Sequence, residues 1–176
     1  SLLTRQKIEE LKNIGLDSFA ISVDGPDYES YSKIRQVDLD TYNKVLSVID
    51  HVLASGIRLK INTVAFKSNF KIIPTLTKWC VEKGIYEHGI YYYTSIGRGE
   101  RNAERSINPK IWLDFIKAEL TPFSDKIKLS IEWPYIENDK LETTELRCLA
   151  EAERYHLQIL PDGNVYPCAI MASYRM

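Results

Sequence analysis

Two polar side chains lie at the end of an apolar segment near the start of the chain. Because Phe19–Val23 has the composition of a buried strand, Ser22 and Asp24 are expected on one face of it. A hydroxyl and a carboxylate placed in this way can hold ribose hydroxyls or an amino group. Asp24-Gly-Pro26 is also an ordinary turn sequence. Taken alone, this motif favours a turn.

Further polar residues follow the later segments. Arg35 could bind a carboxylate through its guanidinium, although solvent exposure is the simpler interpretation of a lone loop arginine. Asn62 ends another strand-like segment and could bond an adenine edge or a carboxylate, or simply form a turn. Ser95 and Gly97 belong to Thr94-Ser-Ile-Gly-Arg-Gly99, whose glycines would let backbone amides approach a ligand. Each of these signals is weak by itself.

The cysteines Cys80, Cys148 and Cys168 are odd in number and widely spaced, which argues against a disulfide framework. Cys148 and Cys168 flank two short β-rich segments around Pro161-Asp-Gly163, a pattern that predicts a hairpin. Because a hairpin brings its flanks together, the two thiolates could share an iron–sulfur cluster or zinc. That site would need further ligands. Cys80 follows Trp79 on an apolar helix face and is expected in the core.

The elements that must position these residues alternate between helix and strand. The predicted helices span 4–13, 41–55, 72–83 and 109–120, and the predicted strands span 19–23, 58–64, 90–94 and 126–133. Residues 24–40 are expected to form a polar loop. This order favours a parallel sheet with right-handed crossovers, in which chemistry occurs at the carboxyl ends of the strands.

The composition is that of an ordinary globular domain, with 44% hydrophobic and 27% charged residues. A net charge of −1 gives no field to attract nucleic acid or a membrane surface. No apolar run approaches the ~20 residues of a membrane span, and no signal-peptide pattern is present. We therefore expect a cytoplasmic protein with neither partner. The chain starts without Met and stops soon after Cys168, so we interpret it as an excised part of a longer protein.

In their order along the chain, these motifs resemble the middle of radical S-adenosylmethionine (radical SAM) enzymes. The similar segments are Ser1-Leu-Leu-Thr4, Leu11-Lys-Asn-Ile-Gly-Leu16, Ile21-Ser-Val-Asp-Gly-Pro26, Arg35, Lys60-Ile-Asn-Thr63 and Ile96-Gly-Arg-Gly99. The tail, from Cys148 through Leu157-Gln-Ile-Leu-Pro-Asp-Gly-Asn-Val-Tyr-Pro-Cys168, resembles the start of a SPASM or twitch extension, which binds auxiliary iron–sulfur clusters. The likeness covers essentially the whole chain. Its most specific parts are the Ser-Val-Asp-Gly-Pro strand end and the cysteine-flanked hairpin.

The resemblance implies an α/β fold in three parts. Residues 1–135 would form the later β/α units of a partial (β/α)6 TIM-like barrel. Residues 136–147 would be a linker, and 148–176 would begin a small β-hairpin domain for an auxiliary cluster.

The same resemblance implies a cofactor site and a metal site. Ser22 would face the ribose and carboxylate of S-adenosylmethionine, with Asp24 on the same strand face and Arg35 as a carboxylate partner. Asn62 and the backbone around Ser95 and Gly97 would lie toward the adenine. The cysteines Cys148 and Cys168 would be two ligands of an auxiliary [4Fe–4S] cluster.

Two family motifs are absent from these 176 residues: the Cys-x3-Cys-x-x-Cys loop of the catalytic cluster and the Gly-Gly-Glu-type segment. We therefore expect this chain alone to be inactive. The parent enzyme would cleave S-adenosylmethionine reductively to a 5′-deoxyadenosyl radical that acts on a peptide or small-molecule substrate, in a maturation reaction. A barrel without its first strands has an apolar edge. We therefore expect Ala20–Val23 to be exposed and to form an edge-strand dimer.

Two other functions remain open. The chain could be a non-enzymatic α/β domain that binds a ligand or partner, with structural or zinc-binding cysteines. Iron and sulfide that depend on Cys148 and Cys168 would favour the enzyme, whereas stoichiometric zinc would favour the binding domain. An aldolase-like barrel with a Schiff-base lysine is the weakest alternative, because Lys60, the nearest candidate, precedes its strand end.

Overall fold

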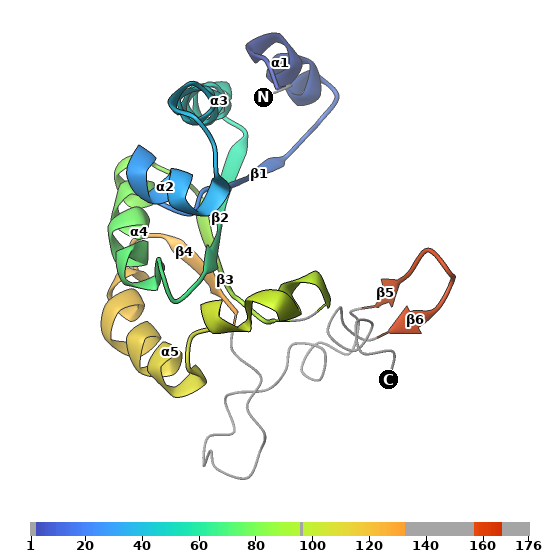
Figure 1. The fold of residues 1–176 in the computed structure, drawn as a ribbon. Helices are drawn as coiled ribbons and strands as arrows, with labels where there is room; N and C mark the ends of the chain where they lie inside the picture. Colours follow the sequence, from blue (N-terminus) through green and yellow to red (C-terminus); the bar gives the residue numbers. More distant parts are fainter. Residues whose placement is uncertain (1–2, 96, 133–156, 167–176) are drawn as a thin grey trace.

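The computed structural model describes residues 3–95, 97–132 and 157–166, which form a helix-covered four-stranded sheet and a two-stranded hairpin (Figure 1). The α-helices are α1 (Arg5–Asn13), α2 (Tyr28–Arg35), α3 (Leu39–Ser55), α4 (Ile73–Glu82) and α5 (Pro109–Phe115). The strands are β1 (Ser18–Ser22), β2 (Arg58–Ala65), β3 (Glu87–Tyr92), β4 (Lys128–Ile131), β5 (Gln158–Ile159) and β6 (Val165–Tyr166). Shorter helical segments are η1 (Phe70–Ile72), η2 (Gly97–Arg105), η3 (Ile116–Leu120) and η4 (Thr121–Phe123).

The larger sheet is parallel throughout, with the strand order β1-β2-β3-β4. The predicted parallel α/β architecture, including its four successive strands, is therefore confirmed. Helices α2 to α5 lie on one side of the sheet (Figure 1), as crossovers of one hand require. Along β2, buried residues alternate with half-buried or exposed ones, so that Leu59, Ile61 and Thr63 face the helices.

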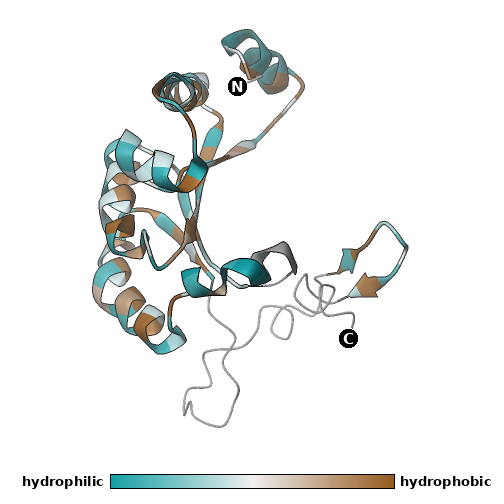
Figure 2. Cartoon of the chain, viewed as in Figure 1, coloured by the Kyte–Doolittle hydropathy of each residue, from teal (hydrophilic) through white to brown (hydrophobic). Residues whose placement is uncertain are grey.

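Two apolar clusters hold the helices to this face of the sheet. The first joins Ile49 and Val52 of α3 to Ile61 of β2, all completely buried. The second packs Trp112 of α5 against the region of Ile90 in β3. Figure 2 shows the same division, with hydrophobic helix faces toward the sheet and hydrophilic faces outward. Within the described ranges, no helix is long and apolar enough to cross a membrane.

Local capping signals fix the helix ends. Asp38 accepts a hydrogen bond from the Thr41 backbone N–H at the start of α3. Gly56 ends α3 with a φ of 77°, a conformation that residues with a Cβ rarely adopt. The predicted helix over 41–55 is confirmed, with a start two residues earlier.

The prediction of a polar loop over residues 24–40 is wrong, because this segment contains α2 and the start of α3. Asp27 and Ser30 form a reciprocal capping box at the start of α2, and Tyr31 anchors the helix in the core. A Cβ on Gly25 would lie 2.6 Å from the Tyr31 nitrogen. Glycine at this position therefore allows α2 to begin directly against the end of β1.

The third strand also differs from its prediction, since β3 begins at Glu87 and not at Ile90. Its first residues are polar but satisfied: Glu87 forms ion pairs with two lysines, and His88 lies against two threonines. These partners come from other elements, so a pattern based on apolar residues underestimates the length of the strand.

Strand β1 lies at one edge of the sheet and pairs only with β2 in the described part of the chain. Ala20 and Ser22 are exposed, as expected for an edge. Val23 is only 2% exposed, so the expectation of exposure was wrong for this residue. Its amide donates to the Asn62 carbonyl and its side chain faces the helices. Dimerisation through β1 stays a prediction.

The predicted hairpin is confirmed where it is described. Strands β5 and β6 are antiparallel, and the turn between them has Gly163 at a φ of 83°. The Gly163 N–H donates to the Leu160 carbonyl across the turn. The expected linker over 136–147 and both proposed metal ligands, Cys148 and Cys168, lie outside the described residues.

Candidate functional site

The side of the sheet turned away from the helices carries a row of small and polar residues, here called the polar face. Ser22, Asn62, Gly89 and Ser130 are successive Cα partners across the four strands. Parallel sheets are usually covered by apolar contacts on both faces. A polar row in register is therefore the mark of a surface that contacts solvent or a ligand.

An ion cluster lies one row closer to the amino ends of the strands. The Glu87 carboxylate accepts from Lys60 Nζ at 2.6 Å, Lys128 Nζ at 2.9 Å and Ser130 Oγ at 2.8 Å. Burial opposes ionisation of Glu87, but these three hydrogen bonds lower its pKa to about 2. Burial likewise opposes protonation of Lys60, but hydrogen bonds with Glu87 and Tyr91 raise its pKa overall. Lys60 is therefore a protonated partner of Glu87 at neutral pH, which argues against a Schiff-base nucleophile.

Gly89 allows two side chains to cross the polar face. A Cβ at this position would lie 2.6 Å from Lys60 Cε and 2.8 Å from Asn62 Oδ1. The Tyr91 hydroxyl lies 3.4 Å from Asn62 Oδ1 and donates to it. The Asn62 amide nitrogen has no hydrogen-bond partner among the described residues. Asn62 thus offers a free donor beside the exposed Ser22 hydroxyl.

Asp24 and Arg35 are brought together as an ion pair. Asp24 is 2% exposed, and its Oδ2 accepts from Arg35 Nε at 2.5 Å. Its Oδ1 accepts from the Val64 backbone N–H at 2.8 Å. The carboxylate therefore ties the end of β1 to β2 and to the last turn of α2. Both residues are candidates by sequence, and their pairing is evident only from the structure.

Asn69 is a structural residue of this edge that the sequence analysis missed. It is 2% exposed, and its Oδ1 accepts from the Phe66 N–H at 2.7 Å. Its Nδ2 donates to the carbonyls of Asp24 and Val64, at 3.2 and 3.0 Å. These partners satisfy three backbone groups where β1 and β2 end. Since one of them lies 45 residues away, no local pattern indicates the role of Asn69.

Ser95 and Gly97 follow β3, at the same carboxyl edge of the sheet as Ser22 and Asn62. Ser95 is half-buried, and η2 begins at Gly97. The Tyr93 hydroxyl donates to the Gly99 carbonyl at 2.9 Å, which anchors the first part of η2. Ser22 is the last residue of β1, and Ser95 and Gly97 follow β3. Asn62 does not end its strand as expected, because β2 continues to Ala65, but it lies beside Ser22.

The described residues contain no group of three or more side chains suited to hold a metal ion. Cys80 is completely buried, as predicted, and burial raises the pKa of its thiol to about 12. Such a thiol is unsuited to metal ligation. The two predicted ligands, Cys148 and Cys168, lie outside this part of the structure, and their role stays a prediction.

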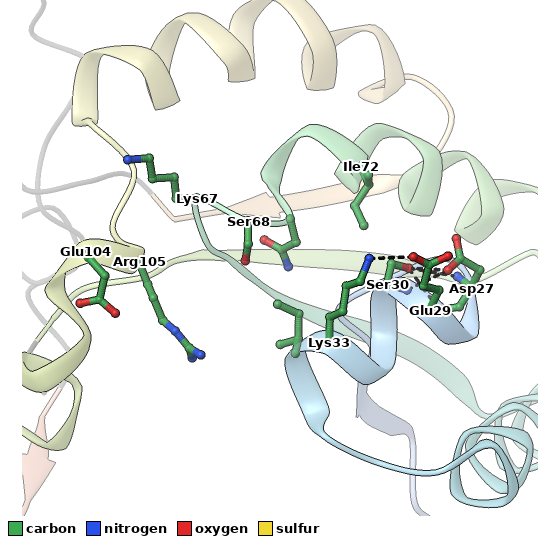
Figure 3. A pocket seen from close by; sticks show the side chains of 11 residues that line it. Asp27, Glu29, Ser30, Lys33, Lys67, Ser68, Ile72, Glu104 and Arg105 are labelled. Carbon is green, nitrogen blue, oxygen red and sulfur yellow. Dashed lines mark hydrogen bonds and ion pairs between the residues drawn. The ribbon is translucent and has the colours of Figure 1, made fainter.

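A separate pocket of about 630 Å³ lies between α2, the segment after β2 and the end of η2 (Figure 3). Neither Ser22 nor Asn62 lines it. The lining residues are Asp27, Glu29, Ser30, Lys33, Ile34, Lys67, Ser68, Asn69, Ile72, Glu104 and Arg105.

Comparison with known proteins gives relatives in both sequence and fold, although no family model matches the chain. An AdoMet-dependent heme synthase from Methanosarcina barkeri is 24% identical over 106 residues, which are 60% of this chain and 30% of that protein. A probable GTP 3′,8-cyclase from Sulfurisphaera tokodaii is 27% identical over 121 residues, covering 68% of this chain and 37% of that protein.

The fold matches that of SuiB from Streptococcus suis. The structure of SuiB bound to S-adenosylmethionine matches with a TM-score of 0.66 and 17% identity, over 100% of this chain and 42% of SuiB. The structure of SuiB bound to its precursor peptide SuiA matches equally well, at 16% identity.

These findings confirm the resemblance to radical SAM enzymes that the motifs indicate. The fold of this chain matches a fragment of such an enzyme that is built of β/α units. The chain spans only about a third of the two curated relatives, at 30% and 37% of their lengths.

Proposed function

We propose that the protein containing this chain is a radical SAM enzyme that binds S-adenosylmethionine across the carboxyl ends of β1, β2 and β3. The observation that carries this proposal is the polar face, where Ser22 and Asn62 are direct neighbours across two strands. Hydrogen-bonding groups at this edge are what a polar cofactor needs in a parallel α/β fold. When bound and reductively cleaved, the cofactor supplies a 5′-deoxyadenosyl radical.

The residues of this chain bind and orient the cofactor. The exposed Ser22 hydroxyl bonds its ribose or carboxylate, and the free Asn62 amide donates to an acceptor on its adenine side. Asp24 uses only the Nε of Arg35, which leaves the terminal guanidinium nitrogens for the cofactor carboxylate. The backbone at Ser95 and Gly97 lies along the adenine side of the proposed cofactor site. In this scheme Asp24 acts by holding Arg35, not by touching the cofactor.

The proposed [4Fe–4S] chemistry rests on the cysteines. Cys148 and Cys168 would be two ligands of an auxiliary cluster, and the ligands of the catalytic cluster would lie elsewhere in the parent. The alternative is a binding domain in which these cysteines hold zinc. Anaerobic reconstitution separates the two: iron and sulfide lost in Cys148→Ala and Cys168→Ala support the enzyme, whereas stoichiometric zinc supports the binding domain.

We propose a peptide or a small molecule as the substrate. SuiB, which shares the fold, has been solved with a precursor peptide. The names of the sequence relatives indicate heme synthesis and GTP cyclisation, which are reactions of small molecules. A maturation reaction fits the predicted SPASM-like tail, because that extension characterises the peptide- and cofactor-maturing enzymes.

Replacing Ser22 and Asn62 tests the cofactor site. We expect Ser22→Ala and Asn62→Ala each to weaken S-adenosylmethionine binding by about tenfold, since each hydrogen bond contributes about 1–1.5 kcal/mol. Isothermal titration of the reconstituted parent enzyme measures the effect. Ser18→Ala is the matched control, because Ser18 is an exposed serine on the same strand face, further from the carboxyl edge. Equal affinities in all three variants would contradict the proposed site.

A further inference from the structure

The pocket beside α2 is distinct from the polar face, and hydrogen bonds hold its walls in place. On one side, the Asp27–Ser30 capping box fixes the first turn of α2. On another, Asn69 fixes the segment after β2 through its backbone hydrogen bonds. The end of η2 forms the remaining wall, and it is joined to the segment after β2 because the Lys67 N–H donates to the Arg105 carbonyl at 2.8 Å. The pocket is therefore formed before any ligand arrives.

Of the charged side chains that α2 contributes to the pocket, Glu29 and Lys33 are paired with each other, and the Asp27 carboxylate is hydrogen-bonded but keeps its negative charge. The Asp27 carboxylate accepts from the Ser30 N–H and hydroxyl, at 2.9 and 3.0 Å. Glu29 forms an ion pair with Lys33 at 2.7 Å. This wall therefore offers a bound anion no free cation, and Asp27 repels it.

The opposite wall presents a cation without a counter-ion. Arg105 has no carboxylate partner within the described residues, and its guanidinium lies 5.7 Å from the centre of the Phe66 ring. Phe66 itself packs against Tyr93 at 4.8 Å between ring centroids. In Figure 3, Arg105 reaches toward α2 and the Ser68 side chain points into the space between them. The Ser68 hydroxyl has no hydrogen-bond partner in the described part of the chain.

We propose that this pocket binds a carboxylate group of the substrate, held by the Arg105 guanidinium and the Ser68 hydroxyl. A guanidinium offers two parallel N–H donors that match a carboxylate, and the hydroxyl of Ser68 in the same pocket adds a third donor. Lys67, which points away from α2 in Figure 3, adds positive charge without direct contact. Glu104 lies next to Arg105 in the same wall and opposes the anion. This inference rests on the proposed function only where it assigns the carboxylate to the substrate.

A titration of this chain with short peptides tests the site. The probes are acetyl-Gly-Glu-Gly-amide and its neutral counterpart acetyl-Gly-Gln-Gly-amide, followed by backbone amide shifts of residues 67–69 and 105. We expect the acidic peptide to bind in the millimolar range and the neutral one at least tenfold more weakly. Free glutarate tests whether the bound carboxylate belongs to a peptide or to a small molecule. If glutarate binds as tightly as the acidic peptide, the pocket is assigned to a small carboxylic acid.

Charge variants give effects of opposite sign. Arg105→Gln should weaken binding of the acidic peptide by at least tenfold, whereas Glu104→Gln should strengthen it severalfold. Arg101→Gln is the control, since Arg101 is an exposed arginine of η2 outside the pocket. Equal binding of the two peptides, equal loss in Arg101→Gln, or weaker binding in Glu104→Gln would overturn the proposal. None of these results depends on S-adenosylmethionine, so the cofactor site stands or falls separately.

Discussion

Asp24→Ala is expected to lower the free energy of unfolding by about 3 kcal/mol, the lower end of the range for breaking a buried ion pair. The substitution removes a carboxylate that is 2% exposed and accepts hydrogen bonds from two partners. It leaves the Val64 N–H unsatisfied and Arg35 without its counter-ion. The effect stays at the low end because the Arg35 side chain is 36% exposed and can be solvated.

Urea denaturation of three variants checks this expectation. Asp24→Asn keeps an acceptor for the Val64 N–H and should lose only about half as much stability. Asp17→Ala, in an exposed residue just before β1, should change stability by less than about 0.5 kcal/mol. If Asp24→Ala resembles Asp17→Ala, the carboxylate does not hold the strand ends together.

His88 should make the protein less stable as the pH falls below about 6.5. Its ring is completely buried, with Nε2 2.9 Å from Thr63 Oγ1 and Nδ1 3.1 Å from Thr77 Oγ1. Burial lowers the pKa of His88 from 6.5 to about 4. Between these two values the unfolded chain binds a proton that the folded chain does not. The free energy of unfolding therefore keeps its full value above pH 6.5 and falls by about 3 kcal/mol as the pH is lowered toward 4.

Thermal or urea unfolding between pH 7.5 and pH 4 measures this loss. His88→Leu should flatten the profile in that window, whereas His51→Gln should leave the slope in place. Glu87 acts at lower pH, because the pKa of its folded state is about 2 and that of the free side chain is 4.5. Its contribution is thus lost between those values. An unchanged slope in His88→Leu would assign the pH dependence to other groups.

Much of the fold could be predicted because its signals are local. Gly56 ends α3, and an apolar stripe on that helix is visible without any tertiary information. Gly163 likewise marks the hairpin turn between β5 and β6. The helix α2 was missed because its first turn is polar and its stability comes from a capping box and one buried aromatic residue, Tyr31.

The site could be predicted only as a set of separate residues. Ser22 and Asn62 become neighbours through strand register, and Asp24 meets Arg35 only because α2 folds back over β1. The role of Gly89 depends on side chains from β2 that cross over it. Such relations connect elements that are distant in the sequence, and local spacing carries no information about them.

The most direct test of the central claim is to read the coding sequence upstream of Ser1. We expect it to encode Cys-x3-Cys-x-x-Cys about a hundred residues earlier, which corresponds to about three β/α units of ~30 residues. That result would place the cluster motif of a radical SAM enzyme in the same protein as Ser22 and Asn62. An uninterrupted reading frame without that motif would contradict the proposed function and remove the cofactor roles of these residues. The predictions for Asp24 and His88 would be unaffected.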